Sequence, residues 1–305
     1  MRGQGRPALV LLAPFFVVFV AAMLVPLGYT LFLSLFTWQA HGLGFSPPER
    51  VFVGIENYAR AFGSPQLQDG LVIIGLYCAI SVPVMIVLAV LLALLLDSRS
   101  VRAPRLGQLL LFLPHAVPDI IAALLWAYLY LPGISPIVRL LASAEIHVDF
   151  LSRELILPAI INIALWMWTG YNMVIFYTAL KAVPPETIEA ASVDGANGLQ
   201  IALRIKLPLL RPAVVLVLLF SVIGALQLFN SPTLMRTITS SVNSTYTPAM
   251  FIYDAAFASH DSGLAAAASI VLAGIAAALS WIVTRSSRPR AAARDTARSA
   301  RRRRP

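Results

Sequence analysis

The chain has 305 residues, of which 59% are hydrophobic and only 12% are charged. A soluble domain of this length could not bury so much apolar surface, so the composition excludes an ordinary soluble protein and predicts several membrane crossings. The net charge of +9 does not indicate a nucleic-acid partner, because nine arginines are concentrated between Arg285 and Arg304, directly after a hydrophobic segment. We expect this tail to be disordered and to be attracted to anionic membrane lipid.

Six segments have the roughly 20 apolar residues that one helix needs to cross a bilayer. They are residues 8–36, 71–96, 106–131, 155–180, 207–229 and 263–284. The first run extends well past the length of a signal-peptide core, which indicates an uncleaved anchor. The sequence therefore predicts an all-α integral membrane protein, with a transmembrane domain over 8–284, an N-terminal segment over 1–7 and a basic tail over 285–305.

The distribution of Lys and Arg predicts the orientation of these spans. Eighteen basic residues fall in the N-terminus, the second connection, the fourth connection and the tail, whereas five fall in the other connections. We therefore expect both termini to be cytoplasmic, together with the connection between the fourth and fifth spans. Three longer connections, at about 37–70, 132–154 and 230–262, are expected on the outer side.

The fourth connection contains a compact stretch that is punctuated by turn residues. Pro185 can open a short helix, since Pro is tolerated in a first turn. This helix is expected to end near Asp194, where Gly195 can adopt the left-handed conformation that turns the chain. A second short helix follows before the fifth span begins. The pattern predicts a helix-turn-helix module over 185–208, which is suited to docking another protein.

The same stretch has a specific sequence pattern: E-A-A, three residues, G, nine residues, I-x-L-P. This pattern resembles the cytoplasmic coupling loop of ABC importer permeases, and the D-G-A at 194–196 resembles the version found in sugar importers. The positions concerned are Glu189, Ala190, Ala191, Asp194, Gly195, Ile205, Leu207 and Pro208. The resemblance covers nearly the whole chain: the segment 52–58 is similar to the outer segment of the first permease in pairs of the maltose and glycerol-phosphate type.

The resemblance implies a type I importer permease of the carbohydrate family in the bacterial plasma (inner) membrane. Two cytoplasmic ATPase subunits, which use ATP and Mg, would grip this loop and that of a second homologous permease. An extracytoplasmic solute-binding protein would deliver a sugar or sugar derivative, and this chain would form half of the pathway. Neither Lys181 nor Lys206 follows a Gly-rich phosphate loop, so we expect no ATP hydrolysis and no bound cofactor in this chain. The four scattered histidines predict no catalytic or metal site.

Polar residues inside the spans are costly in lipid and therefore need an explanation. In the third span, His115 and Asp119 would share one helix face if the helix continued through Pro118. The two side chains are expected either to form a polar wall of the pathway or to form a hydrogen-bonded pair at a subunit seam.

The fourth and fifth spans hold further polar and aromatic candidates. Tyr171 and Asn172 are the better candidates for contacts with a sugar, since aromatic faces stack on sugar rings and an amide both donates and accepts hydrogen bonds. Gln227 and Asn230 are expected either at the mouth of the pathway or in hydrogen bonds between helices. Trp166 and Trp168 could also stack on a sugar, but a role as packing or interface anchors is favoured for them. Gly224 and Ala225 are expected at a close approach of helices.

A different class of protein also fits part of the sequence. A proton-coupled secondary transporter of a small polar solute could use His115 and Asp119 for proton transfer. Such transporters often have repeated halves with interrupted helices. The sequence shows no convincing repeat, and this alternative leaves the module over 185–208 unexplained.

Overall fold

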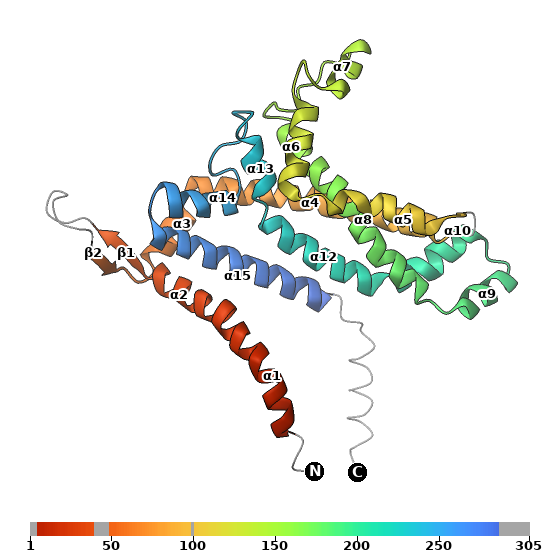
Figure 1. Cartoon of the computed structure of the whole chain (residues 1–305), viewed down its shortest axis with the longest axis horizontal. Coiled ribbons are helices and arrows are strands. Elements are labelled where there is room, and N and C mark those ends of the chain that lie inside the picture. Colours follow the sequence, from red (N-terminus) through yellow and green to blue (C-terminus); the bar gives the residue numbers. More distant parts are fainter. Residues whose placement is uncertain (1–4, 40–48, 99–100, 287–305) are drawn as a thin grey trace. The chain divides into compact units, whose positions relative to one another are not determined.

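The computed structural model describes residues 5–39, 49–98 and 101–286 (Figure 1). Residues 1–4 of the predicted N-terminal segment and residues 287–305 of the predicted basic tail lie outside the described residues. The described chain is built mainly of helices, as the predicted fold class requires. It divides into two compact units, one formed by Met1–Leu71 and Ser244–Ile275 and the other by Val72–Asn243 and Ala276–Pro305.

Helices of membrane-spanning length match the predicted spans in order. Five single helices within the described ranges are long and apolar enough: Leu11–Ser34, Pro65–Leu96, Ile156–Lys181, Arg211–Met235 and Ser262–Arg285. The third predicted span is instead a bent pair, Pro104–Ala116 and Asp119–Tyr130, whose axes meet at 91°. The chain therefore has six spans only if the bent pair counts as one.

The bend in the third span has a local cause in its two prolines. A 3-10 turn (η3, Leu113–Ala116) ends at Val117, whose ψ of 130° is extended rather than helical. A residue before proline is driven out of the helical region by the proline ring, and Pro118 also lacks the N–H that a continuous helix would use. A straight third helix with His115 and Asp119 on one face, one of the arrangements considered from the sequence, is therefore wrong.

The first unit contains the N-terminal helices, a hairpin and part of two long helices. Its elements are α1 (Gly5–Phe19), a π-helical turn (Val20–Leu24), α2 (Val25–Ser34), β1 (Phe36–Gln39), β2 (Glu49–Phe52), α3 (Glu56–Gly63), the start of α4 (Pro65–Leu96), α14 (Pro248–Tyr253), a second π-helical turn (Asp254–Ala258) and most of α15 (Ser262–Ser286). The antiparallel pair β1–β2 joins Phe36 opposite Phe52. The sequence did not predict this hairpin.

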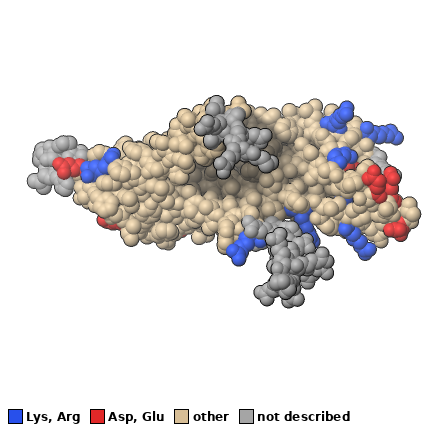
Figure 2. Space-filling view, turned by 90° about the horizontal axis from the view of Figure 1, so that it is seen from below, with Lys and Arg blue, Asp and Glu red and all other residues tan. Residues whose placement is uncertain are grey.

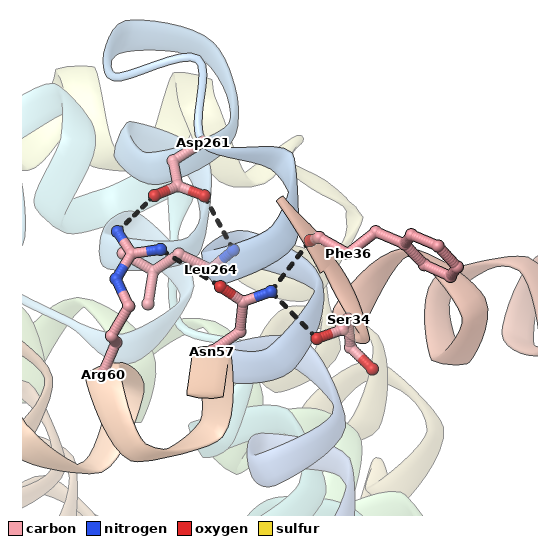
Figure 3. A network of polar contacts seen from close by, with 6 residues as sticks. All are labelled: Ser34, Phe36, Asn57, Arg60, Asp261 and Leu264. Carbon is pink, nitrogen blue, oxygen red and sulfur yellow. Dashed lines mark hydrogen bonds and ion pairs between the residues drawn. The ribbon is translucent and has the colours of Figure 1, made fainter. Parts of the chain in front are cut away.

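A buried asparagine holds the first unit together (Figure 3). The Asn57 side chain is completely buried and donates from Nδ2 to the carbonyl oxygens of Ser34 (3.0 Å) and Phe36 (2.8 Å). Gly263 of α15 packs so closely here that a Cβ would overlap the Phe36 carbonyl. Nearby, Arg60 forms an ion pair with Asp261, which also caps α15 by accepting from the Leu264 N–H. One amide thereby joins the end of α2 to β1 and α3.

The second unit contains the rest of α4 and a bundle around α8. Its further elements are α5 (Pro104–Phe112), η3, α6 (Asp119–Tyr130), α7 (Pro136–Ser143), α8 (Ile156–Lys181), α9 (Pro185–Val193), α10 (Gly198–Ile201), a π-helical turn (Ala202–Lys206), α11 (Leu207–Leu209), α12 (Arg211–Leu226) and α13 (Asn230–Met235). The core packs α4, α8 and α12 together through buried side chains that include Ala89, Met173, Phe176 and Val217. The bundle provides the ends from which the module over 185–208 extends and the helices that line a polar cavity.

Helix α5 approaches α8 closely at one glycine. A Cβ at Gly170 would overlap the backbone carbonyl of Leu111 at the end of α5. Small residues are what allow two helix backbones to come this close in a membrane. The predicted close packing at Gly224 is wrong, because a Cβ there would meet only open space. Ala225 is buried.

Candidate functional site

The module over 185–208 has the helix-turn-helix structure that its sequence predicts. Helix α9 begins at Pro185 and ends at Val193, and Gly195 adopts a φ of +83°, which confirms the predicted left-handed turn. The Gly195 N–H donates to the Ser192 carbonyl (3.1 Å), and the Ala196 N–H donates to the Ala191 carbonyl (2.9 Å). These bonds satisfy carbonyls at the end of α9 and fix the direction in which the chain leaves it.

The second helix of the module is started by a capping box that the sequence analysis missed. The Gln200 N–H donates to Asn197 Oδ1, and the Asn197 N–H donates to Gln200 Oε1, both at 2.9 Å. An N-cap Asn followed three residues later by Gln is a readable signal. The helical path then runs from Gly198 through the π-helical turn into α11. The turn at Gly195 and the start of the second helix are therefore both defined by local hydrogen bonds.

The module presents its motif residues on an accessible surface. Glu189, Ala190, Asp194, Gly195, Leu207 and Pro208 are exposed, while Ala191 and Ile205 are half-buried. Two apolar side chains flank the turn, with Val193 89% exposed and Leu199 68% exposed. Figure 2 shows charged side chains gathered over the part of the second unit that carries α9 and α10. Exposed apolar groups inside a charged surface are typical of a docking site for another protein.

One carboxylate ties the base of this module to the bundle. Asp97, directly after α4, pairs through Oδ1 with Lys181 Nζ (2.7 Å) and through Oδ2 with Lys206 Nζ. Lys181 ends α8, and Lys206 ends the π-helical turn of the module. These are the only two lysines in the sequence. Both of them converge on one acidic side chain, which we call the Asp97 clasp.

Burial and the neighbouring positive charges have opposite effects on the pKa of Asp97. The Asp97 side chain is only 9% exposed, compared with 17% for Lys206 and 55% for Lys181. Burial raises the pKa of the Asp97 carboxyl, but the hydrogen bonds and positive charges of the two lysines outweigh burial and hold that pKa below its usual range. The Asp97–Lys206 pair is the better shielded of the two pairs and is expected to contribute more to stability.

A cavity of about 340 Å³ lies in the second unit between α4, α6, α8, α12 and α13. Five of the six residues that the sequence singled out for a pathway line it: Asp119, Tyr171, Asn172, Gln227 and Asn230. Trp168, Phe220 and Phe229 also line the cavity, together with several aliphatic side chains. Trp168, for which the sequence favoured an anchoring role over contact with a sugar, is 44% exposed and lines this space. Trp166 instead packs edge-on against Trp126.

The polar groups around the cavity differ in how fully they are already bonded. Asn172 is buried, and its Nδ2 donates to the Trp168 carbonyl (3.0 Å) and to Met85 Sδ (3.2 Å). Its carbonyl oxygen is the group left to face the cavity. Gln227 and Asn230 are exposed, so their amides are accessible from the cavity. The arrangement can offer both donors and acceptors to a hydroxylated solute.

His115 and Asp119 have separate surroundings. His115 packs its ring against Trp168 and Tyr171, with centroids 4.6 and 4.5 Å apart, and is absent from the cavity lining. Asp119 begins α6, and its Oδ1 accepts a hydrogen bond from Ser231 Oγ (3.3 Å). No hydrogen bond joins His115 to Asp119 among those of the described residues. His115 thus supports the aromatic wall from behind, whereas Asp119 faces the cavity.

The fold is that of a multi-pass helical membrane protein with an exposed helix-turn-helix module and a polar, aromatic cavity. Residues 58–290 match the family described as the binding-protein-dependent transport system inner membrane component. The match covers well over half of the chain, so the chain belongs to this family. It is an inner-membrane permease of a binding-protein-dependent ABC importer, in which ATP hydrolysis belongs to a separate subunit. Family membership does not support the proton-coupled alternative.

Named relatives agree with this assignment over nearly the full length. The trehalose transport system permease protein SugA of Mycobacterium tuberculosis is 28% identical over 92% of this chain and 88% of that protein. The diacetylchitobiose uptake system permease protein NgcF of Streptomyces coelicolor is 30% identical over 88% of this chain and 79% of that protein. The sn-glycerol-3-phosphate transport system permease protein UgpA of Pectobacterium atrosepticum is 28% identical over 86% of this chain and 88% of that protein.

A solved structure shares the fold. A bacterial alginate ABC transporter, in complex with a periplasmic protein that holds an alginate pentasaccharide, has a chain that superposes with a TM-score of 0.77. The superposition covers 93% of this chain and 95% of that chain, at 21% identity. The likeness establishes the permease fold of the present chain.

Proposed function

We propose that this chain is one of two homologous permease subunits in a sugar importer and that it forms half of the translocation pathway. The relatives described above include permeases named for trehalose and diacetylchitobiose, which supports a carbohydrate as the solute. A solute-binding protein on the outer side delivers the sugar. Two ATPase subunits, which bind ATP and Mg, drive transport from the cytoplasm. The cavity residues Asp119, Tyr171, Asn172, Gln227 and Asn230 face the moving solute, and His115 backs their aromatic wall.

The observation that carries the coupling role is the exposed module over 185–208. Its two helices are each fixed by local hydrogen bonds, and its turn presents Val193 and Leu199 to a partner. The Asp97 clasp joins the base of the module to the ends of α4 and α8, so a displacement of the module is transmitted to the bundle. We assign the module to ATPase docking, with both chain termini on the same cytoplasmic side.

Site-specific cross-linking tests the docking role. Ala190→Cys, in a Cys78→Ser background, places the only thiol of the chain on the exposed face of α9. A bifunctional thiol reagent should join it to an ATPase subunit that carries a cysteine in its own docking surface. Leu140→Cys on α7 is the matched control, since Leu140 is 72% exposed on another part of the second unit. Equal cross-linking at both positions, or none at position 190, would contradict the docking role.

Uptake measurements test the carbohydrate assignment. The chain would be reconstituted in proteoliposomes with the second permease, the ATPase subunits and the binding protein of the same importer. ATP-dependent accumulation of labelled trehalose, lactose and other oligosaccharides should exceed that of labelled amino acids, which serve as the control. Accumulation of an amino acid with no accumulation of any sugar would rule out the proposed solute class.

A further inference from the structure

The cavity in the second unit has an asymmetric charge. Asp119 is the one residue with a formal charge among those that line it, and no Lys, Arg or His contributes to the wall. Asp119 is the first residue of α6, a helix of 12 residues. Its Oδ1 accepts a hydrogen bond from Ser231 Oγ. The cavity therefore carries an anionic group that nothing in its lining neutralises.

The rest of the lining suits an uncharged polyhydroxylated solute. Trp168, Tyr171 and Phe220 supply faces on which the apolar side of a sugar ring can stack. Gln227 and Asn230 supply amides that can both donate to and accept from hydroxyl groups. An anionic solute would find no cation in the half of the pathway that this chain lines, and it would meet the Asp119 carboxylate in a partly apolar space, where like charges repel more strongly than in water.

We propose that Asp119 sets the charge class of the solute: the cavity accepts neutral or cationic sugars and rejects anionic ones such as sugar phosphates and uronates. The inference rests on the proposed function, in which this cavity is part of the sugar pathway. It adds something that family membership does not decide, because the relatives include one named for trehalose and one named for sn-glycerol-3-phosphate.

The charge of the cavity can be measured without any transport assay. Gln227→Cys, in a Cys78→Ser background, places a thiol in the lining. Its reaction rates are compared for two water-soluble methanethiosulfonates of similar size, a cationic trimethylammonium reagent and an anionic sulfonate reagent. Any effect of the site on the thiolate itself is the same for both reagents, so the ratio of the two rates reports the local potential. Leu140→Cys on α7 gives the ratio outside the cavity.

The expected ratio depends on the carboxylate at position 119. The cationic reagent should react about tenfold faster at position 227, relative to the ratio at position 140, because a carboxylate in the same partly apolar cavity is screened less than in water; tenfold corresponds to about 1.4 kcal/mol. Asp119→Asn should bring the ratio close to that of the control. Asp119→Glu should retain it, and so should Ser231→Ala, which removes the hydrogen bond but not the charge.

Two results would overturn the inference. One is a rate ratio at position 227 that Asp119→Asn leaves unchanged. The other is a thiol at position 227 that neither reagent reaches, since the cavity would then not be open to solutes. Both results are independent of whether the chain transports a sugar. Failure of the charge inference would therefore be distinguishable from failure of the proposed function.

Discussion

Removal of the Asp97 carboxylate should weaken the connection between the module and the bundle. Asp97→Asn keeps the shape of the side chain but removes the negative charge that Lys181 and Lys206 share. The two ammonium groups would then lie close together with no counter-charge. Lys206 is the more affected of the two, because it is 17% exposed whereas Lys181 is 55% exposed and can turn towards water.

The size of the effect follows from this difference in exposure. Exposed ion pairs contribute up to about 1 kcal/mol, whereas loss of one partner of a fully buried pair costs about 3–5 kcal/mol. The ion pairs of the clasp are neither fully exposed nor fully buried. We therefore expect Asp97→Asn to lower the free energy of unfolding by about 1–3 kcal/mol. For a chain of this size that is a fall in Tm of about 2–6 °C. Lys206→Met should have most of this effect and Lys181→Met much less.

The clasp also predicts a dependence on pH. Because the folded-state pKa of Asp97 lies below its unfolded value, the stabilisation is complete above the unfolded pKa of about 4 and is lost as the pH falls through the folded pKa. The Tm difference between the parent and Asp97→Asn, measured in detergent, should therefore be constant from pH 7 to about 5 and close at lower pH. Glu154→Gln, at an exposed acidic residue of the same unit, is the control and should change Tm little at any pH.

Equal Tm values for the parent and Asp97→Asn at pH 7 would refute this reasoning. So would a Tm difference that persists unchanged below the folded pKa, since the loss would then come from packing and not from charge. A larger effect from Lys181→Met than from Lys206→Met would show that exposure does not rank the two pairs.

Two further substitutions test the packing of each unit. Gly170→Ala should lower Tm by several degrees, because the new methyl would overlap the Leu111 carbonyl and force α5 away from α8. Gly75→Ala is the control and should leave Tm unchanged, since there is open space around Gly75. Equal Tm values for the two variants would contradict the close approach of α5 and α8. Asn57→Ala should cost about 2–4 kcal/mol, since it leaves the Ser34 and Phe36 carbonyls buried without their donor; a Tm within a degree of the parent would contradict the role of this amide.

Features governed by neighbouring residues could be predicted from the sequence. The spans follow from the length of each apolar run, and the module follows from Pro185 at a helix start and Gly195 at a turn. The capping box formed by Asn197 and Gln200 had an equally local signal that was not used. The hairpin at β1 and β2 was missed because each strand has only four residues within a connection that otherwise resembles a loop.

Features that depend on distant residues could not be predicted in the same way. Asp97 and Lys206 are 109 positions apart, and nothing in either neighbourhood indicates that they meet. The prolines around His115 were visible, but how far they bend the span depends on packing against α8. Gly170 and Gly224 are both glycines in apolar helices, and only the three-dimensional arrangement shows that the first touches another backbone. The cavity likewise unites residues of five helices.

The central claim is that the module over 185–208 couples ATP hydrolysis to transport, and a pair of variants at Gly195 tests it most directly. Gly195 has a φ of +83° and donates its N–H to Ser192. Pro fixes φ near −65° and has no N–H, so Gly195→Pro abolishes the turn. Asn adopts the left-handed region readily, so Gly195→Asn preserves it.

The decisive measurement is ATP-dependent sugar uptake by the reconstituted importer, together with copurification of the ATPase subunits. We predict that Gly195→Pro inserts normally in the membrane but loses both the ATPase subunits and uptake, while Gly195→Asn keeps both. A Gly195→Pro variant that retains its ATPase subunits and transports at the parent rate would contradict the account.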